Sequence, residues 1–143
     1  TIVFSRSGTL MYEVAFNLSR NGYGQKICLG IGGDPINGTN LIEAVEMVRI
    51  SENNDPIVVV GEIGGDAEEK FVSYLEANGI SNRMVAYIAG RSAPKEKKMG
   101  HAGAIVYGKY GSAESKFESF ARLGIPMAKT PAELPLLLRI KTN

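Results

Sequence analysis

The chain has 143 residues, of which 44% are hydrophobic, and its 16 basic and 15 acidic residues give a net charge of +1. This length and composition are typical of one folded domain and give no sign of disorder. A net charge so close to zero argues against nucleic acid or an anionic membrane as the main partner, so any anion site must be local. No apolar stretch approaches the roughly twenty residues that cross a bilayer, and the first residues show no signal-peptide pattern.

The single cysteine, Cys28, lies in an apolar run, which predicts a buried and unreactive thiol. One cysteine cannot form an internal disulfide, and this favours a reducing compartment such as the cytoplasm, or the mitochondrial matrix in a eukaryote. The chain begins with a strand-like run at residues 1–4 and no initiator Met, and we expect it to be a fragment of a longer polypeptide.

Short β-rich runs alternate with longer helical patterns, which predicts βα units around a parallel sheet. We expect strands at residues 1–4, 26–30, 57–61, 84–88 and 126–129. The predicted helices span residues 9–20, 40–51, 67–78, 113–123 and 131–140. Five βα units indicate an α/β fold, a flavodoxin-like three-layer sandwich with a five-stranded parallel sheet. In such folds ligands meet the loops at the carboxyl ends of the strands.

The loop after the first predicted strand is rich in small hydroxyl residues and leads into a helix. Such a loop exposes backbone N–H groups at the positive end of the helix dipole, which is an anion site. The candidate phosphate-binding residues are Ser5, Ser7, Gly8 and Thr9. An ordinary N-cap by Ser7 or Thr9 explains the same residues equally well. A second glycine-rich stretch, residues 30–39, lacks the spacing of a dinucleotide fingerprint and fits a tight turn.

Glu62 ends the third predicted strand among glycines, where a carboxylate would be partly desolvated. A carboxylate in that position could orient an imidazole and hold its tautomer. A capping or loop hydrogen bond is the alternative. Glu68 and Glu69 follow in the first turn of the next helix, where the helix dipole alone accounts for them.

The only histidine, His101, follows a basic loop at residues 91–98 and is flanked by Gly100 and Gly103. Imidazole is both a base and a nucleophile near neutral pH, and its small neighbours leave it accessible. His101 is therefore a candidate group carrier. A lone histidine can also be an ordinary surface or core residue, and a charge run an ordinary solvated loop.

Together these loops resemble the phosphohistidine domain that forms the C-terminal half of succinyl-CoA synthetase α subunits. The resemblance spans nearly the whole chain and rests on four ordered motifs. They are Ser5-Arg6-Ser7-Gly8-Thr9-Leu10 with Tyr12-Glu13, Gly30-Ile31-Gly32-Gly33-Asp34-Pro35, Gly61-Glu62-Ile63-Gly64-Gly65, and Tyr87-Ile88-Ala89-Gly90 running on to Met99-Gly100-His101-Ala102-Gly103-Ala104-Ile105. Ser92, Glu96 and Lys98 stand where the family most often has Thr, Gly and Arg.

The resemblance implies an acid–CoA ligase that reversibly converts succinyl-CoA, a nucleoside diphosphate and phosphate into succinate, CoA and a nucleoside triphosphate. It implies that His101 carries the phosphoryl group, that Glu62 orients the imidazole, and that the helix beginning near Ser7 to Thr9 faces the phosphohistidine. One further implication is a β subunit that binds the nucleotide and supplies a second, opposing helix terminus.

Residues 1–143 are accordingly expected to form a single ligase domain, without the family's N-terminal CoA-binding domain. The full enzyme would use CoA and magnesium-bound ADP/ATP or GDP/GTP. This domain alone would be inactive, hold no metal, and bind no more than phosphate or a similar anion.

Two other interpretations stay open. A related acyl-CoA ligase, of the malate or citrate-cleaving type, would share the phosphohistidine motif. A flavodoxin-like binding or signalling module would belong to a different class. Receivers need an acidic cluster after the first strand, where this chain has Ser5-Arg6-Ser7, and flavin sites usually add aromatic residues at the loop tips.

Overall fold

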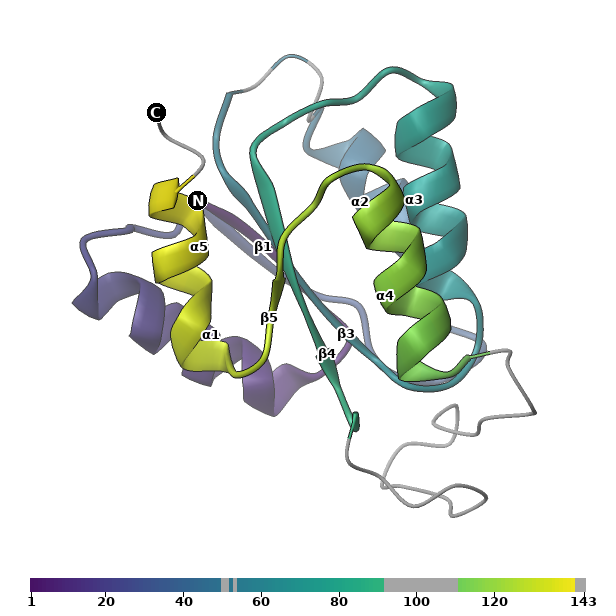
Figure 1. Ribbon diagram of the computed structural model, residues 1–143, viewed down its shortest axis with the longest axis horizontal. Helices are drawn as coiled ribbons and strands as arrows, with labels where there is room; N and C mark the ends of the chain where they lie inside the picture. Colours follow the sequence, from purple (N-terminus) through teal and green to yellow (C-terminus); the bar gives the residue numbers. More distant parts are fainter. Residues whose placement is uncertain (50–51, 53, 92–110, 141–143) are drawn as a thin grey trace.

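The computed structural model describes residues 1–49, 52, 54–91 and 111–140. Within these ranges five strands form one parallel sheet, and helices pack on both of its faces (Figure 1). The strands are β1 (Ile2–Ser5), β2 (Ile27–Gly30), β3 (Ile57–Glu62), β4 (Met84–Ala89) and β5 (Met127–Ala128). The helices are α1 (Gly8–Arg20), α2 (Leu41–Met47), α3 (Ala67–Ala77), α4 (Ala113–Arg122) and α5 (Leu134–Ile140).

The strand order is β2-β1-β3-β4-β5, and every neighbouring pair is parallel. This is the flavodoxin-like order 2-1-3-4-5, so the predicted fold class is confirmed. In the centre of the sheet β1 lies beside β3, with Ser5 level with Val60. Parallel neighbours end at the same edge of the sheet, and the chain after Ser5 therefore emerges beside Glu62.

Two apolar layers hold the sheet between its helices. One layer lies under α2, α3 and α4 and includes Phe4, Phe71 and Phe120, and the other lies under α1 and α5 and includes Val14 and Leu138. The longest described helix has 13 residues. No helix in the described ranges is long and apolar enough to cross a membrane.

Three element boundaries differ from those predicted from the sequence. Helix α2 ends at Met47, close to Arg49, whose φ of 46° is unusual for a non-glycine residue and incompatible with a continuing helix. The last helix begins with a 3₁₀ turn at Pro131–Glu133 before α5, because Pro135 has no N–H with which to continue an α-helical ladder. Strand β5 has only two paired residues, level with Ala86 and Tyr87.

The prediction of a buried Cys28 is wrong. Its strand, β2, lies at an edge of the sheet and pairs only with β1. Side chains alternate along β2, so that Ile27 and Leu29 face the apolar layer under α2 while Cys28 lies on the other face and is exposed. On an edge strand, therefore, an apolar run can leave the side chains of one face exposed.

Candidate functional site

The turn between β1 and α1 is fixed by two serines. The Ser5 hydroxyl is buried, donates to the backbone oxygen of Ser7 at 2.6 Å and accepts from the backbone N–H of Ser7 at 3.1 Å. The Ser7 hydroxyl caps α1 by accepting from the backbone N–H of Leu10 at 3.3 Å. Ser5 thus shapes the turn, and Ser7 performs the N-cap role that the sequence left as an alternative.

The first turn of α1 is open toward solvent. Gly8 and Thr9 are exposed, and none of the described residues accepts from their backbone N–H groups. A Cβ at Gly8 would meet no atom within 4 Å. The first turn holds no acidic residue, whereas α2, α3 and α4 each carry at least one there. The positive end of the α1 dipole is therefore available to an anion.

Glu62 is the last residue of β3, and only 6% of its surface is exposed, as predicted for a partly desolvated carboxylate. The Arg6 guanidinium lies beside it, with Nη2 at 3.4 Å from Glu62 Oε1. Arg6 Nη1 also donates to the backbone oxygens of Glu62 at 3.4 Å and Gly64 at 3.2 Å. The carboxylate is thus held at the same edge of the sheet as the α1 N-terminus.

The explanation of Glu68 by the helix dipole alone is wrong. Glu68 is fully buried and lies between two cations, accepting from Arg6 Nη1 at 3.0 Å and from Lys116 Nζ at 2.5 Å. Lys116 is also fully buried and donates to Glu69 at 2.9 Å and to the backbone oxygen of Gly65 at 3.0 Å. A helix dipole acts within one helix, whereas these contacts join α3 to Arg6, directly after β1, and to Lys116 of α4.

Arg6 and Lys116 lie at the edge of this site, and neither was predicted from the sequence to belong to it. A signal for Lys116 was present, because it lies three residues after Ala113 and four before Phe120, both of which are buried on the inner face of α4. A lysine at a core-facing helical position needs a buried partner. No comparable signal marked Arg6.

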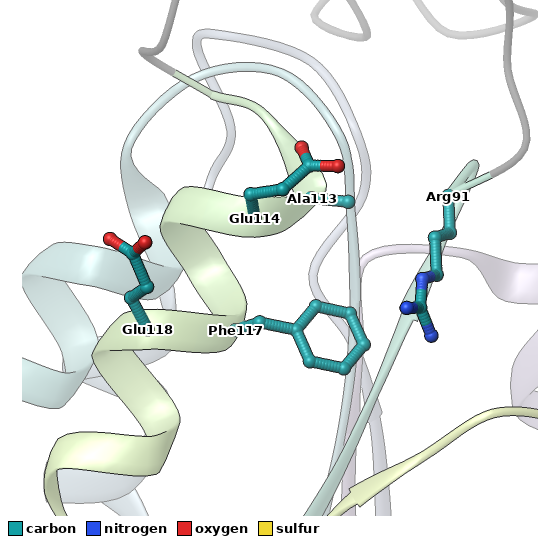
Figure 2. A pocket seen from close by; sticks show the side chains of 5 residues that line it. All are labelled: Arg91, Ala113, Glu114, Phe117 and Glu118. Carbon is teal, nitrogen blue, oxygen red and sulfur yellow. The ribbon is translucent and has the colours of Figure 1, made fainter.

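A shallow pocket of about 260 Å³ lies where β4 ends and α4 begins. It is lined by Arg91, Ala113, Glu114, Phe117 and Glu118. Figure 2 shows the Arg91 side chain facing the Phe117 ring, and its guanidinium carbon is 4.8 Å from the ring centroid. This stacking holds Arg91, two residues after the end of β4, against α4.

His101 lies outside the described residues, as do its flanking glycines and the substituted positions Ser92, Glu96 and Lys98. The described chain resumes at Gly111, whose backbone oxygen accepts from Gly64 N–H at 2.7 Å. Gly111 therefore lies beside the loop that follows Glu62. Among the described residues, no group of three or more His, Cys, Asp or Glu side chains could hold a metal ion.

Comparison with known proteins gives a match between the CoA-ligase family model and residues 4–123. The chain belongs to the CoA-ligase family. It is 44% identical, over 132 residues, to the α subunit of the ADP-forming succinate–CoA ligase of Staphylococcus aureus. The same subunit of Methanothermobacter thermautotrophicus is also 44% identical over 132 residues.

Solved structures support the same relationship. The CoA-ligase chain superposes on ATP citrate lyase from Methanothrix soehngenii, in complex with citrate and coenzyme A, with a TM-score of 0.84 and 26% identity. That likeness covers 97% of this chain and 23% of the lyase. The match to the S. aureus subunit covers 92% of this chain and 43% of the relative. The chain thus spans less than half the length of these relatives.

Proposed function

We propose that this chain is the phosphate-carrying part of a succinate–CoA ligase α subunit, with His101 as the phosphorylated residue. The observation that carries the proposal is the 44% identity over 132 residues to such subunits. The family match spans residues 4–123, a range that contains the only histidine of the chain. The complete enzyme interconverts succinyl-CoA, a nucleoside diphosphate and phosphate with succinate, CoA and a nucleoside triphosphate.

In this reaction phosphate displaces CoA from succinyl-CoA to give succinyl phosphate. A ring nitrogen of His101 attacks its phosphorus, succinate leaves, and the phosphoryl group then passes to the nucleoside diphosphate. Phosphoryl transfer depends on positioning and charge stabilisation more than on covalent protein chemistry. Glu62 accepts from the imidazole and holds its tautomer, while Gly8 and Thr9 offer backbone N–H groups to the phosphoryl oxygens. The burial of Glu62 and the open first turn of α1 support these roles.

The remaining parts of the enzyme lie outside these 143 residues. An N-terminal CoA-binding domain would present the thioester, and a β subunit would bind the magnesium nucleotide, ADP/ATP or GDP/GTP. The matched relatives are named as α subunits and are more than twice as long as the matched segment, which supports this division. The exposed thiol of Cys28 is compatible with a reducing compartment, the cytoplasm or the mitochondrial matrix.

The first experiment assays the 143-residue chain with succinate, CoA and ATP or GTP, alone and with the missing domain and β subunit supplied. We expect no turnover by the chain alone, because the reacting groups are not brought within the few ångströms that transfer requires. Turnover should appear with the complete set of parts and be abolished by His101→Asn. Sustained succinyl-CoA formation by the chain alone would contradict the division of parts.

The role of α1 is tested by Gly8→Pro. Gly8 is the first residue of the helix, where proline is favoured, and Ser7 already has the extended backbone that precedes proline (φ −114°, ψ 119°). The substitution thus removes one N–H donor and leaves the helix in place. We expect phosphohistidine formation in the complete enzyme to slow by about 10²-fold, the value of one preorganised donor. Gly8→Ala keeps the N–H and is the matched control.

A citrate-cleaving relative is the second candidate, because solved ATP citrate lyases share this fold at 25% and 26% identity. The domain described here would carry phosphate in either enzyme. Assaying the complete enzyme against succinate, malate and citrate separates the two. Succinate should give the highest kcat/KM, and a preference for citrate would favour the second candidate.

A further inference from the structure

A buried cluster of charges lies directly behind Glu62. Two cations, Arg6 and Lys116, face three carboxylates, Glu62, Glu68 and Glu69. Arg6 is 5% exposed, and Glu68 and Lys116 are fully buried. The cluster connects the ends of β1 and β3 with α3 and α4, so that four elements meet at the point from which Glu62 projects.

Arg6 is held firmly within this cluster. Its Nη1 donates to both carboxylate oxygens of Glu68, at 3.0 and 3.2 Å, and to the backbone oxygens of Glu62 and Gly64. Its Nη2 faces Glu62 Oε1 at 3.4 Å. The planar guanidinium therefore pairs with both carboxylates, so that the orientation of one carboxylate restricts the orientation of the other.

Glu68 is in turn fixed from the opposite side. Lys116 Nζ donates to its Oε2, and the backbone N–H of Glu62 donates to its Oε1 at 3.1 Å. Space is equally restricted, since a Cβ at Gly61 would lie 2.5 Å from Glu68 Oε1. Lys116 and Glu68 thus hold Arg6, and Arg6 holds the Glu62 carboxylate.

We infer that Arg6 is a positioning residue for the phosphoryl-transfer site, acting through Glu62 and anchored by Glu68 and Lys116. This inference rests on the proposed function, in which Glu62 orients the imidazole of His101. A carboxylate at the end of a strand has rotatable side-chain bonds, and orientation of a reacting group requires that they be fixed. Arg6 supplies both the opposite charge and the second point of attachment.

A double-mutant cycle tests the inference in the complete enzyme. Arg6→Gln is made alone and in a Glu62→Gln background, and single-turnover phosphorylation from the nucleoside triphosphate is measured by ³²P incorporation. If Arg6 acts through Glu62, its substitution should slow phosphorylation by about 10²-fold in the wild-type background. In the Glu62→Gln background the same substitution should change the rate by less than about twofold, because the carboxylate that Arg6 positions is gone.

Arg122→Gln is the matched control. Arg122 lies on α4, as Lys116 does, and pairs with a glutamate of α3, Glu76, at 3.1 Å, but both side chains are 51% exposed. We expect no change in the phosphorylation rate, since this pair lies on the protein surface and away from Glu62. Arg6→Lys keeps the charge but cannot pair with two carboxylates through one planar group. It is made in the same two backgrounds, and it replaces Arg6→Gln in the cycle if circular dichroism shows that Arg6→Gln is unfolded.

The outcomes separate this inference from the proposed function. Equal slowing by the Arg6 substitution in both backgrounds would show that Arg6 supports the fold alone and would overturn the inference, while the phosphohistidine mechanism would stand. Unchanged rates in both backgrounds would overturn it as well. Failure of the folded wild-type enzyme to form a phosphohistidine would reject the proposed function and this inference together.

Discussion

Glu68→Gln is the substitution that most directly tests the buried cluster as a source of stability. The change conserves side-chain shape but removes the negative charge that faces Arg6 and Lys116. It also replaces one acceptor oxygen with an NH₂ group, which points a donor at a cation. Because Glu68 and Lys116 have no exposed surface, water cannot compensate for the lost charge.

The expected cost follows from burial. Removing one partner of a buried ion pair destabilises a protein by about 3–5 kcal/mol. In the Glu68→Gln variant Arg6 and Lys116 would keep only Glu62 and Glu69 as carboxylate partners. In a domain of this size 1 kcal/mol corresponds to roughly 3 °C in the melting temperature. Glu68→Gln should therefore lower the melting temperature by about 9–15 °C.

Glu76→Gln is the matched control, since Glu76 is also on α3 and pairs with a cation of α4, but at an exposed site. Surface ion pairs contribute about 0–1 kcal/mol, which corresponds to a shift of at most about 3 °C. Both variants are measured by circular dichroism at 222 nm during thermal and urea unfolding. Equal shifts for the two variants would refute the argument that burial gives the Glu68 cluster its effect.

Three further outcomes are expected. Gly61→Ala should destabilise the chain by about 1–3 kcal/mol in urea unfolding, because its Cβ would overlap Glu68, whereas Gly30→Ala, whose Cβ meets only an ordinary contact at 3.8 Å, should cost less than about 1 kcal/mol. Asn40→Ala removes the capping box of α2 and should cost about 1 kcal/mol, and no loss would contradict the cap geometry. Although Cys28 is exposed, the protein atoms beside its thiol partly desolvate it and raise its pKa, so alkylation by iodoacetamide should be slow at pH 7 and accelerate above the ordinary thiol pKa; a rate already at its plateau at pH 7 would disprove this.

The fold was predictable because its determinants are local and repeated. Five apolar runs alternating with helical patterns led to the observed α/β sandwich, and every predicted strand overlaps an observed one. The errors occurred where a contact between elements, or the backbone of one residue, decides the outcome. Arg49 ends α2 with a positive φ, and Cys28 is exposed because β2 is an edge strand.

The candidate site was only partly predictable. Burial of Glu62 and the N-cap at Ser7 follow from their places, at the end of β3 and directly before α1. The roles of Arg6, Glu68 and Lys116 depend mainly on contacts between residues far apart in the sequence, with 62 positions between Arg6 and Glu68 and 48 between Glu68 and Lys116. The helical spacing of Lys116 indicates that it is buried, but no pattern within one loop or one helix identifies its partner, and the helix dipole does not account for the burial of Glu68.

The most direct test of the phosphate-carrier account is mass spectrometry of the complete enzyme after incubation with a nucleoside triphosphate, under conditions that avoid acid. The chain has one histidine, so a phosphohistidine peptide has only one possible site. The account predicts a gain of one phosphate on His101, lost after addition of succinate and CoA and missing in His101→Asn. Turnover without phosphate on His101, or with phosphate on another residue, would contradict it.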